Sequence, residues 1–232
     1  MINSLNQNKR INKIVSFISK KSIAEIGADH GYITKQAFNK NKINFALLTD
    51  ISSKCLQKAI NTFKLTNFNV CFEVGDGLEA VKTYYQKKNH KRINQIVIAG
   101  MGGLEIAKIL KQNNSFNNLV LQPQKNTQEL REFLTNNNYK ILKDSIVKDN
   151  NFYYSVLLVK KQSKISKISK LDMIFGKTNL REFNSDFNDY LDYRLSQITQ
   201  VLKVKSVVKF IQEQKYIEQA KKILVKRGIT NV

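Results

Sequence analysis

The sequence predicts an α/β fold, a doubly wound and mostly parallel sheet that ends in an antiparallel edge hairpin and is followed by a pair of helices. Up to residue 160, apolar runs of strand length alternate with segments whose apolar residues recur at helical spacing. The run at residues 93–99 is continuous enough to be buried on both faces, as central parallel strands are. Two further runs, at residues 139–147 and 152–159, are joined by the polar turn 148–151, which is typical of an antiparallel hairpin.

The segment before the first strand has the pattern of an amphipathic helix. Its apolar residues share one helical face and are surrounded by lysines and arginines. They are Leu5, Ile11, Ile14, Val15 and Ile18. If this helix packs ahead of the first strand, Arg10 faces the same end of the sheet as the turn that follows that strand. There its guanidinium would either clamp a ligand carboxylate through two hydrogen bonds or stay solvated at the surface.

The first strand, residues 23–26, runs into a turn with two glycines. A fold that binds dinucleotides would have Gly-x-Gly-x-x-Gly here, because pyrophosphate lies against bare backbone and a helix N-terminus. This chain has Gly27-x-Asp29-x-Gly31 instead, and a carboxylate at Asp29 would repel pyrophosphate but suit a ligand with ammonium and sulfonium charges. With Glu25 in front, the pattern resembles the first motif of class I S-adenosylmethionine (SAM) methyltransferases. The alternative is an ordinary glycine turn of an α/β protein.

Acidic residues also follow the second and third strands. Asp50 closes the apolar run 43–49 and lies 21 residues after Asp29, near the spacing at which Rossmann-like folds place an acid on the ribose hydroxyls. As an alternative, Asp50 would cap the next helix. After the third strand, a SAM-binding fold would place Asp76 at the exocyclic amine of the adenine, with Gly77 leaving room. The alternative there is a simple turn before the next helix.

The fourth and fifth strands end in residues that suit a base. The fourth strand runs into Ala-Gly-Met-Gly-Gly at residues 99–103, where three glycines would leave backbone amides exposed and leave space for a flat ring. Because ligands of open α/β sheets collect beyond the carboxyl ends of the strands, we expect this loop beside the Asp29 turn. The fifth strand, residues 116–121, is closed by Gln122 and Pro123, which would present a donor and an acceptor to a base edge.

The character of the chain changes after residue 160, so we expect two domains, residues 1–160 and 161–232. A linker rich in lysine and serine at residues 160–170 is followed by two apolar stripes at helical spacing. The first stripe consists of Phe187, Leu191, Leu195, Ile198 and Leu202, and the second of Val204, Val208, Ile211, Ile223 and Leu224. Two helices folded back as an antiparallel pair would bury both stripes. The outer face of the pair would hold RNA, or the pair would dimerise as a coiled coil.

The formal net charge of +21 points to a polyanionic partner. Neutralising phosphates releases counterions and supplies much of the binding energy, which makes nucleic acid the first candidate and an anionic membrane surface the second. The alternative is a general preference for Lys, Asn and Ile, which would add lysines everywhere.

The cysteines and the hydropathy pattern indicate a cytoplasmic protein. Cys55 and Cys71 lie apart from any Cys-x-x-Cys pattern or histidine cluster, so we expect buried free thiols and no metal site. No apolar run is long enough to span a membrane, and the first residues lack the apolar centre of a signal peptide.

Five stretches of the chain match the motifs of one family. They are residues 26–30 (Ile-Gly-Ala-Asp-His), 75–78 (Gly-Asp-Gly-Leu), 98–103 (Ile-Ala-Gly-Met-Gly-Gly), 121–123 (Leu-Gln-Pro) and 130–134 (Leu-Arg-Glu-Phe-Leu). Together they resemble the bacterial TrmK family, and the resemblance extends over the whole chain. It implies an enzyme that uses SAM to methylate N1 of the adenine at position 22 in tRNA. The sequence departs from the family pattern at Ile33-Thr34, at Gln124, and at Tyr154, where an acid often follows the tyrosine of that strand.

The resemblance also implies which residues surround the cofactor SAM and the target adenine. The cofactor-binding set is Arg10, Gly27, Asp29, His30, Gly31, Asp50, Ile51, Asp76, Gly77, Ala99, Gly100 and Met101. The substrate-binding set is Tyr32, Gly102, Gly103, Gln122, Pro123 and Tyr153. Asp29 is the candidate catalytic residue, either stabilising the cationic product or steering the N6 proton. Tyr32 or Tyr153 would stack on the extruded base.

Other interpretations of these residues remain open from the sequence. One is an RNA-binding Rossmann module without catalysis, although the three acids at the strand ends argue against it. Another is a SAM methyltransferase that acts on a different RNA or on a small molecule. An NAD-dependent oxidoreductase is disfavoured by the missing Gly-x-Gly-x-x-Gly. We expect a monomer with tRNA as its partner and no membrane contact, and a dimer through the C-terminal helices is the alternative.

Overall fold

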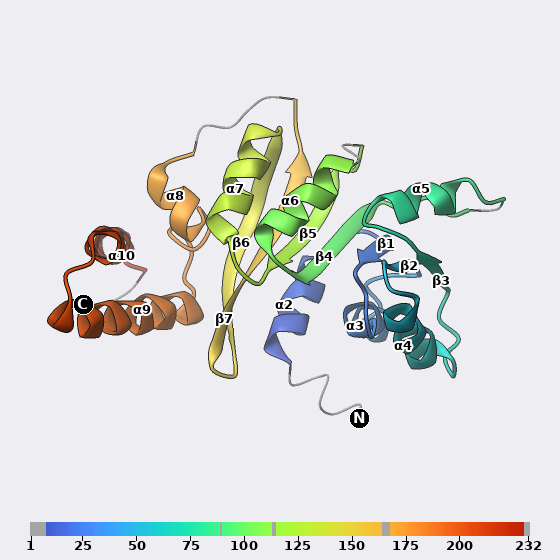
Figure 1. The fold of residues 1–232 in the computed structure, drawn as a ribbon, viewed down its shortest axis with the longest axis horizontal. Helices are drawn as coiled ribbons and strands as arrows, with labels where there is room; N and C mark the ends of the chain where they lie inside the picture. The colour runs from blue at the N-terminus through green and yellow to red at the C-terminus, as the bar shows by residue number, and fades with distance from the viewer. Residues whose placement is uncertain (1–7, 89, 113–114, 164–167, 230–232) are drawn as a thin grey trace.

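A seven-stranded sheet forms the centre of the computed structural model, which describes residues 8–88, 90–112, 115–163 and 168–229 (Figure 1). The strand order is β3-β2-β1-β4-β5-β7-β6. β1 to β5 are parallel, and β7 is antiparallel to both of its neighbours. The strands are β1 (Ser22–Ile26), β2 (Phe45–Asp50), β3 (Val70–Val74), β4 (Gln95–Met101), β5 (Asn118–Pro123), β6 (Tyr139–Asp149) and β7 (Phe152–Lys161). The predicted fold class, a parallel α/β sheet with an antiparallel edge hairpin, is confirmed.

Helices cover both faces of the sheet (Figure 1). They are α2 (Lys9–Phe17), α3 (Tyr32–Asn39), α4 (Ser53–Phe63), α5 (Glu79–Tyr85), α6 (Gly103–Gln112) and α7 (Thr127–Asn136). Side chains of a strand point alternately to the two faces, so Ile23 of β1 packs with α2, α3 and α4. Ala24 and Ile26 of the same strand pack with α5, α6 and α7. The sheet therefore has an apolar layer on each side.

The expected first helix is present as α2, and its apolar stripe faces the sheet. Ile11, Ile14 and Val15 are buried among residues of β1, α3 and the β6–β7 hairpin. Ile18 is buried directly after the helix ends. Leu5, which the sequence also assigns to this stripe, lies outside the described residues.

The turn of the β6–β7 hairpin is shorter than the sequence predicts. β6 ends at Asp149 and β7 begins at Phe152, so the turn is Asn150 and Asn151 instead of the four residues 148–151. Asn150 has φ +53°, a left-handed conformation that asparagine tolerates and that two-residue hairpin turns require. The outer two residues of the expected turn are paired within the ladder.

The tip of this hairpin projects beyond the neighbouring strand. β5 pairs with β7 only at residues 157–160 of β7. Residues 152–156 are paired with β6 alone. In Figure 1 the tip therefore extends past the ends of the parallel strands.

Three helices follow the sheet, α8 (Lys170–Phe175), α9 (Ser185–Val204) and α10 (Val208–Lys226). Both long helices that the sequence predicts are present. In Figure 1 α9 lies across the view and α10 is seen close to end-on, so the two helices pack at an angle to each other. Ion pairs join them, from Arg194 Nε to Glu213 Oε1 and from Lys221 Nζ to Asp192 Oδ1, both at 2.5 Å.

The apolar stripe predicted for the first of these helices is confirmed. The stripe predicted for the second is confirmed only at its end, where Leu224 is buried and Ile223 is partly buried. In α9, Phe187, Leu191 and Ile198 are buried, and Leu195 and Leu202 pack beside them. In α10 the buried residues are Ile217, Ala220 and Leu224, whereas the predicted Val204, Val208 and Ile211 are exposed. Val204 ends α9, so a stripe counted from it begins the second helix in the wrong phase.

The expected linker at residues 160–170 is shorter than predicted, because β7 extends to Lys161 and α8 begins at Lys170. Residues 164–167 of that linker lie outside the described residues. A buried ion pair attaches α8 to the sheet: Arg131 Nε of α7 lies 2.7 Å from Asp144 Oδ2 of β6. Arg131 Nη1 also donates to Met173 O and Ile174 O of α8, at 3.2 and 2.7 Å.

Candidate active site

The carboxyl ends of β1, β2, β4 and β5 meet at one edge of the sheet, and the predicted ligand residues follow them. Gly27 and Ala28, directly after β1, both donate their amides to Thr49 O of β2, at 2.8 and 3.0 Å. Gly27 has φ +69°, and a Cβ added there would lie 2.0 Å from Met101 Cε of β4. The positive φ favours glycine, and a Cβ there would also require the end of the Met101 side chain to move. The turn after β1 is thus tied to both neighbouring strands, and these two amides are used within the fold.

A buried acid, Glu25 of β1, connects the strand before this turn with the helix after it. Its Oε2 accepts from Thr34 N (3.1 Å) and from Thr34 Oγ1 (2.5 Å), in the first turn of α3, which Gly31 caps. Burial raises the pKa of Glu25 to about 7, although the two bonds from Thr34 oppose the rise. From the sequence, Glu25 stands out only as part of a motif. The signal that could have identified it is an acid inside an otherwise apolar strand.

Asp50, at the end of β2, is held by two backbone amides. Its Oδ2 accepts from Asp29 N (3.4 Å) and its Oδ1 from Ser52 N (2.8 Å). Ser52, not Asp50, is the N-cap of α4, because its hydroxyl accepts from Cys55 N. The helix-cap alternative for Asp50 is therefore wrong. The half-buried carboxylate stands beside Ile51, whose side chain is 70% exposed, so an acid and an apolar surface lie together at this strand end.

Asp29 does not offer a free carboxylate. Lys58 Nζ of α4 lies 2.8 Å from its Oδ1, and His30 Nε2 lies 3.8 Å from its Oδ2. The hydrogen bond from Lys58 is the main reason that the pKa of Asp29 is lowered. The side chain is half exposed, and the ring of His30 stacks on Tyr32 with centroids 5.0 Å apart. A cationic ligand group at Asp29 would share the carboxylate with Lys58.

The two residues predicted after β3 have different surroundings. Asp76 is exposed, as a ligand residue would be. Gly77 is buried, and a Cβ there would lie 2.4 Å from Gln112 Oε1, which accepts from Leu78 N. The space that Gly77 leaves is filled by Gln112. The prediction that it makes room for a base is therefore wrong.

The predicted glycine loop, residues 99–103, is strand up to Met101 and helix from Gly103. β4 continues to Met101 because Ala99 pairs with Gln122 and Met101 with Pro123 of β5, so Gln122 and Pro123 also lie within a strand. Gly103 begins α6; its amide donates to Lys125 O (2.8 Å), and a Cβ would lie 2.2 Å from Asn126 O. The amide of Gly103 is thus not exposed.

Gly100 and Gly102 are the glycines of this segment with free space. A Cβ added to Gly100 would meet nothing within 4 Å, and one added to Gly102 would only touch the aliphatic part of Lys125 at 3.4 Å. The space predicted for a flat base is therefore limited to Gly100 and Gly102 and does not include Gly103.

Arg10 and Gln122, predicted to contact different ligands, contact each other. Arg10 Nη1 donates to Gln122 Oε1 (2.8 Å), and the guanidinium lies 5.4 Å from the centre of the Tyr154 ring. Gln122 is fully buried, and its Nε2 donates to Pro123 O (3.0 Å). The prediction that this amide faces a base edge is wrong, because both of its polar atoms are engaged. The other N–H groups of the Arg10 guanidinium have no partner among the described residues.

Tyr153 faces away from this edge, contrary to the prediction. Its ring packs against Tyr190 and Tyr193 of α9, with centroids 5.5 Å apart in each case. Tyr154, the next residue of β7, points to the opposite face and packs with the α2 layer. The tyrosine of β7 that faces the candidate site is therefore Tyr154.

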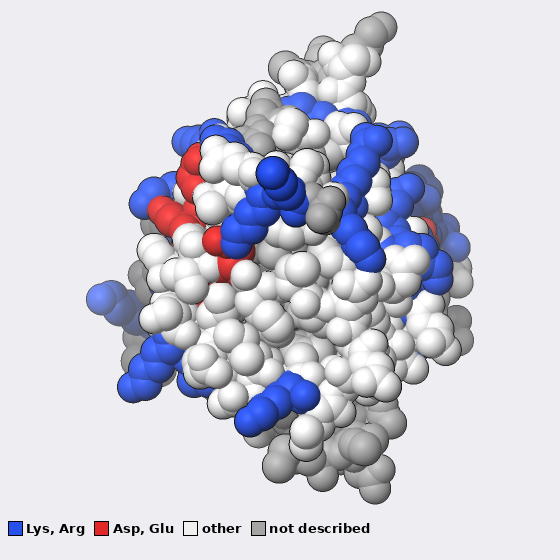
Figure 2. Space-filling model, turned by 90° about the vertical axis from the view of Figure 1, so that its right-hand side faces the viewer, with Lys and Arg blue, Asp and Glu red and all other residues white. Residues whose placement is uncertain are grey.

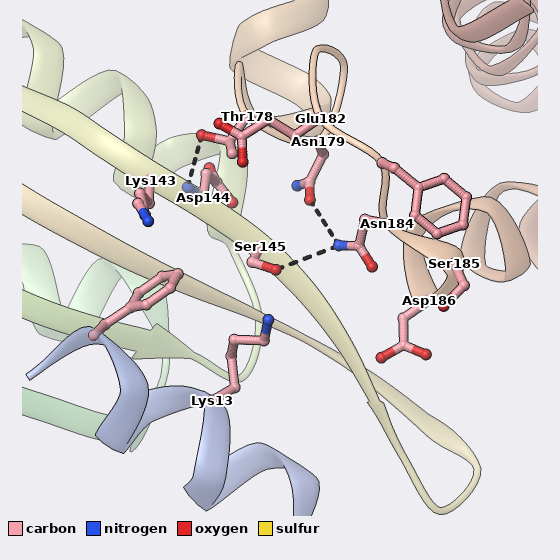
Figure 3. A pocket seen from close by; sticks show the side chains of 12 residues that line it. Lys13, Lys143, Asp144, Ser145, Thr178, Asn179, Glu182, Asn184, Ser185 and Asp186 are labelled. Carbon is pink, nitrogen blue, oxygen red and sulfur yellow. Dashed lines mark hydrogen bonds between the residues drawn. The ribbon is translucent and has the colours of Figure 1, made fainter. Parts of the chain in front are cut away.

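A cavity of about 390 Å³ lies elsewhere, between α2, the middle of β6 and the segment that joins α8 to α9 (Figure 3). In it the Asn184 amide points between Ser145 and Asn179, at 3.3 Å from each side-chain oxygen. Lys13 of α2 also lines it. None of its lining residues belongs to the sets predicted for cofactor or substrate, so this cavity is a feature of the joint with the C-terminal helices.

Over residues 8–88, 90–112, 115–163 and 168–229, no group of three or more His, Cys, Asp or Glu side chains is placed to hold a metal ion. Within the same residues, no helix combines the length and apolar character needed to cross a membrane. Cys55 and Cys71 are free, as predicted, but they are partly buried instead of fully buried.

Positive charge extends far from the C-terminal helices. Figure 2 shows the side of the molecule that carries α4, α5 and β3, where Lys and Arg surround an uncharged centre and Asp and Glu occupy few places. Part of the net charge of +21 is therefore spread over the surface, as a general preference for lysine would spread it.

Comparison with known proteins gives the chain its family. A family model described as TrmK, tRNA (adenine(22)-N(1))-methyltransferase, matches residues 23–228. A Mycoplasma genitalium protein provisionally named a tRNA methyltransferase is 35% identical over 172 residues, 72% of this chain and 76% of that protein. The tRNA (adenine(22)-N(1))-methyltransferase of Bacillus subtilis is 29% identical over 164 residues, 68% of this chain and 66% of that protein. The solved structure of M. capricolum TrmK in complex with S-adenosyl-homocysteine aligns with a TM-score of 0.75 and 23% identity, over 96% of this chain and 98% of that one. The chain belongs to the TrmK family of tRNA (adenine(22)-N(1))-methyltransferases.

Proposed function

We propose that this chain transfers the methyl group of SAM to N1 of the adenine at position 22 of tRNA, at the edge where β1, β2 and β4 end. Family membership over residues 23–228 supports the reaction and the substrate. At the site, the geometry of Asp50 supports the proposal best. Two backbone amides orient its half-buried carboxylate at the end of β2. SAM, when bound, supplies the electrophilic methyl group.

The residues at this edge fit the parts of SAM. The Asp50 carboxylate would accept hydrogen bonds from the ribose hydroxyls, as the acid at this position does in Rossmann-like folds. The exposed Ile51 side chain would cover a face of the adenine ring, and the exposed Asp76 would accept from its amino group. Arg10 would bind the carboxylate of the methionine part through the N–H groups that Gln122 does not use.

The reaction depends on aligning adenine N1 with the methyl group of SAM more than on acid–base catalysis. Adenine N1 keeps its lone pair at neutral pH, so the protein does not have to remove a proton before the base attacks. Holding N1 in line with the methyl group contributes roughly 7–11 kcal/mol in favourable cases. The positive charge that forms on the base needs stabilisation, and Asp29 is the candidate because its lowered pKa keeps the carboxylate ionised.

The substitution Asp29→Asn tests this assignment, because it keeps the shape of the side chain and removes its charge. We expect kcat at saturating SAM and tRNA to fall about tenfold or more. Asp192→Asn is the matched control, since Asp192 of α9 is an exposed acid that pairs with Lys221 of α10 and lies outside the strand ends. Full turnover by Asp29→Asn would exclude Asp29 from the chemical step.

We extend the proposal to the remaining parts of the chain. Residues 1–160 would form the methyltransferase domain, and residues 161–232 a helical domain that contacts tRNA. A third apolar cluster supports this division, because its buried members other than Ile146 of β6 come from residues after 161, Phe187, Leu191 and Ile217 among them. The chain would act as a monomer in the cytoplasm, where its tRNA substrate is found.

The direct test uses unmodified tRNA, SAM and the purified chain, followed by mass spectrometry of the nucleosides. We expect 1-methyladenosine, and we expect it to disappear when adenine 22 is replaced by guanine. No methylated nucleoside, or an equal yield from the replaced tRNA, would contradict the proposal. RNA binding without any SAM binding in calorimetry would favour the non-catalytic module.

A further inference from the structure

We infer that Phe152, at the tip of the β6–β7 hairpin, stacks on tRNA beside the target adenine and helps to extrude that adenine from its helix. The inference rests on the proposed function, since it concerns how the same site receives its substrate. N1 lies on the pairing edge of adenine, so the base must leave any pair before it can be methylated. Enzymes that extrude bases offset the lost stacking with apolar side chains that pack on the bases.

The hairpin places Phe152 beside the candidate active site. Beyond its last pair with β5, β7 continues for residues 152–156, which at about 3.3 Å per residue reach roughly 16 Å further. Phe152 is the first residue of β7 and pairs with Asp149. Asp149 Oδ2 accepts from Arg10 N (3.2 Å), so the tip is anchored to the start of α2. Phe152 therefore stands where tRNA would approach the strand ends.

Phe152 is exposed without a benefit to folding. Its side chain is 65% exposed, and the aromatic ring near it is Tyr154, with centroids 6.4 Å apart and planes tilted by 46°. A phenylalanine held in water at the tip of a turn gains little from burial. The same flat ring is a sequence-tolerant platform for nucleobases.

Phe152 also begins a row of planar groups that leads into the site. Phe152 and Tyr154 share one face of β7, because strand side chains alternate. The Arg10 guanidinium follows, 5.4 Å from the centre of the Tyr154 ring, and it bonds to Gln122 at the end of β5. Aromatic rings and guanidinium planes are the groups with which proteins hold unstacked bases. The row connects the exposed tip with the place where the adenine is expected.

The test places the fluorescent base 2-aminopurine at position 22 of the tRNA, whose emission rises when it leaves the stack. We expect Phe152→Ala to give a smaller rise on binding and about a tenfold loss of kcat/KM. Phe152→Trp should keep both, and the affinity for SAM should be unchanged in both variants. The loss should shrink on a tRNA whose adenine 22 is left unpaired by changing its partner base.

Phe183→Ala is the matched control, because Phe183 is 72% exposed and lies between α8 and α9, away from the strand ends. Wild-type fluorescence and rates in Phe152→Ala, or equal losses in Phe183→Ala, would overturn the inference. If the wild-type chain makes 1-methyladenosine and Phe152→Ala is unaffected, only this inference fails. If the wild-type chain makes none, the proposed function fails.

Discussion

Glu25 shows how a buried acid can hold a ligand turn in shape. Its carboxylate accepts two bonds from Thr34, so it connects the residue before the turn with the residue after it. Removing this side chain from water costs free energy unless it is protonated, which is why its pKa is raised to about 7. The shape of the turn and the protonation of Glu25 are therefore linked.

This linkage predicts a pH dependence of stability. The folded pKa of about 7 lies above the ordinary value of 4.5, so the contribution of Glu25 is fully present below pH 4.5 and is lost as the pH rises through 7. Relative to Glu25→Gln, the free energy of unfolding of the wild type should fall by about 3 kcal/mol across that window. Urea unfolding of both proteins at pH 5, 6, 7 and 8 measures this, and a difference that does not change with pH would refute it.

The second prediction for a single residue concerns Asp50 and the affinity for SAM. Hydrogen bonds to a charged group contribute about 1.5–3 kcal/mol each, so Asp50→Ala should raise the Kd for SAM at least about tenfold in calorimetry. Asp186→Ala, which removes an acid of α9, should leave that Kd unchanged. An unaltered Kd in Asp50→Ala would remove Asp50 from the cofactor site.

Some site residues could be predicted from the sequence and others could not. The positions of Asp50 and Asp76 follow from chain order, because an acid directly after a parallel strand must lie at the carboxyl edge of the sheet. The pairing of Asp29 with Lys58 depends on how α4 packs, which no local pattern indicates. Apart from Ser155, residues 152–158 are apolar or aromatic at both odd and even positions, so alternation could not decide which of Tyr153 and Tyr154 faces the site.

At the scale of elements, the Arg131–Asp144 pair joins α7, β6 and α8. Arg131 and Asp144 are 2% and 0% exposed, so loss of one charge leaves the other buried and unpaired. We expect Asp144→Asn to lower the free energy of unfolding by about 3–5 kcal/mol. Lys221→Met, which breaks an exposed pair on α10, should cost no more than about 1 kcal/mol.

The measurement is urea unfolding, with a double variant as a further control. Arg131→Met combined with Asp144→Leu should recover part of the stability, because no unpaired charge remains, while Met173 O and Ile174 O still lose their donor. Equal stabilities of Asp144→Asn and Lys221→Met would show that the buried pair does not hold this joint.

The sequence predicts the elements of the sheet better than those after it. Parallel strands are buried on both faces, so their continuous apolar runs stand out, and the structure moves their ends by only a few residues. The phase of α10 could not be predicted, because the boundary with α9 lies inside the apolar stretch around Val204 and Val208. Which residues face inward depends on where the second helix starts.

For the whole molecule, the question is where tRNA lies on a chain with a net charge of +21 whose lysines are not confined to the C-terminal helices. The proposed division assigns the backbone contacts of tRNA to the C-terminal helices. Lys215 and Lys222 are exposed on α10 and, seven residues apart, lie on one side of it. Lys64 and Lys88 are exposed on the part of the molecule that carries α4 and α5. Replacing each pair of lysines and comparing the effects on tRNA binding distinguishes a defined binding surface from a general abundance of lysine.

Salt dependence provides the measurement. If Lys215 and Lys222 each neutralise a phosphate, replacing both with Gln should weaken tRNA binding and reduce the slope of log K against log salt by about two. Lys64→Gln with Lys88→Gln removes the same charge and should leave the slope unchanged. Equal slopes in the two double variants would place the tRNA elsewhere or show that the charge acts without a defined site.

A crystal structure with S-adenosylhomocysteine tests most directly whether methyl transfer takes place where β1, β2 and β4 end. We expect ribose hydroxyls within hydrogen-bond distance of the Asp50 carboxylate, the adenine against Ile51, and open space at Gly100 for the incoming base. A ligand bound instead in the cavity between α2 and β6, or no ligand at the strand ends, would contradict this expectation.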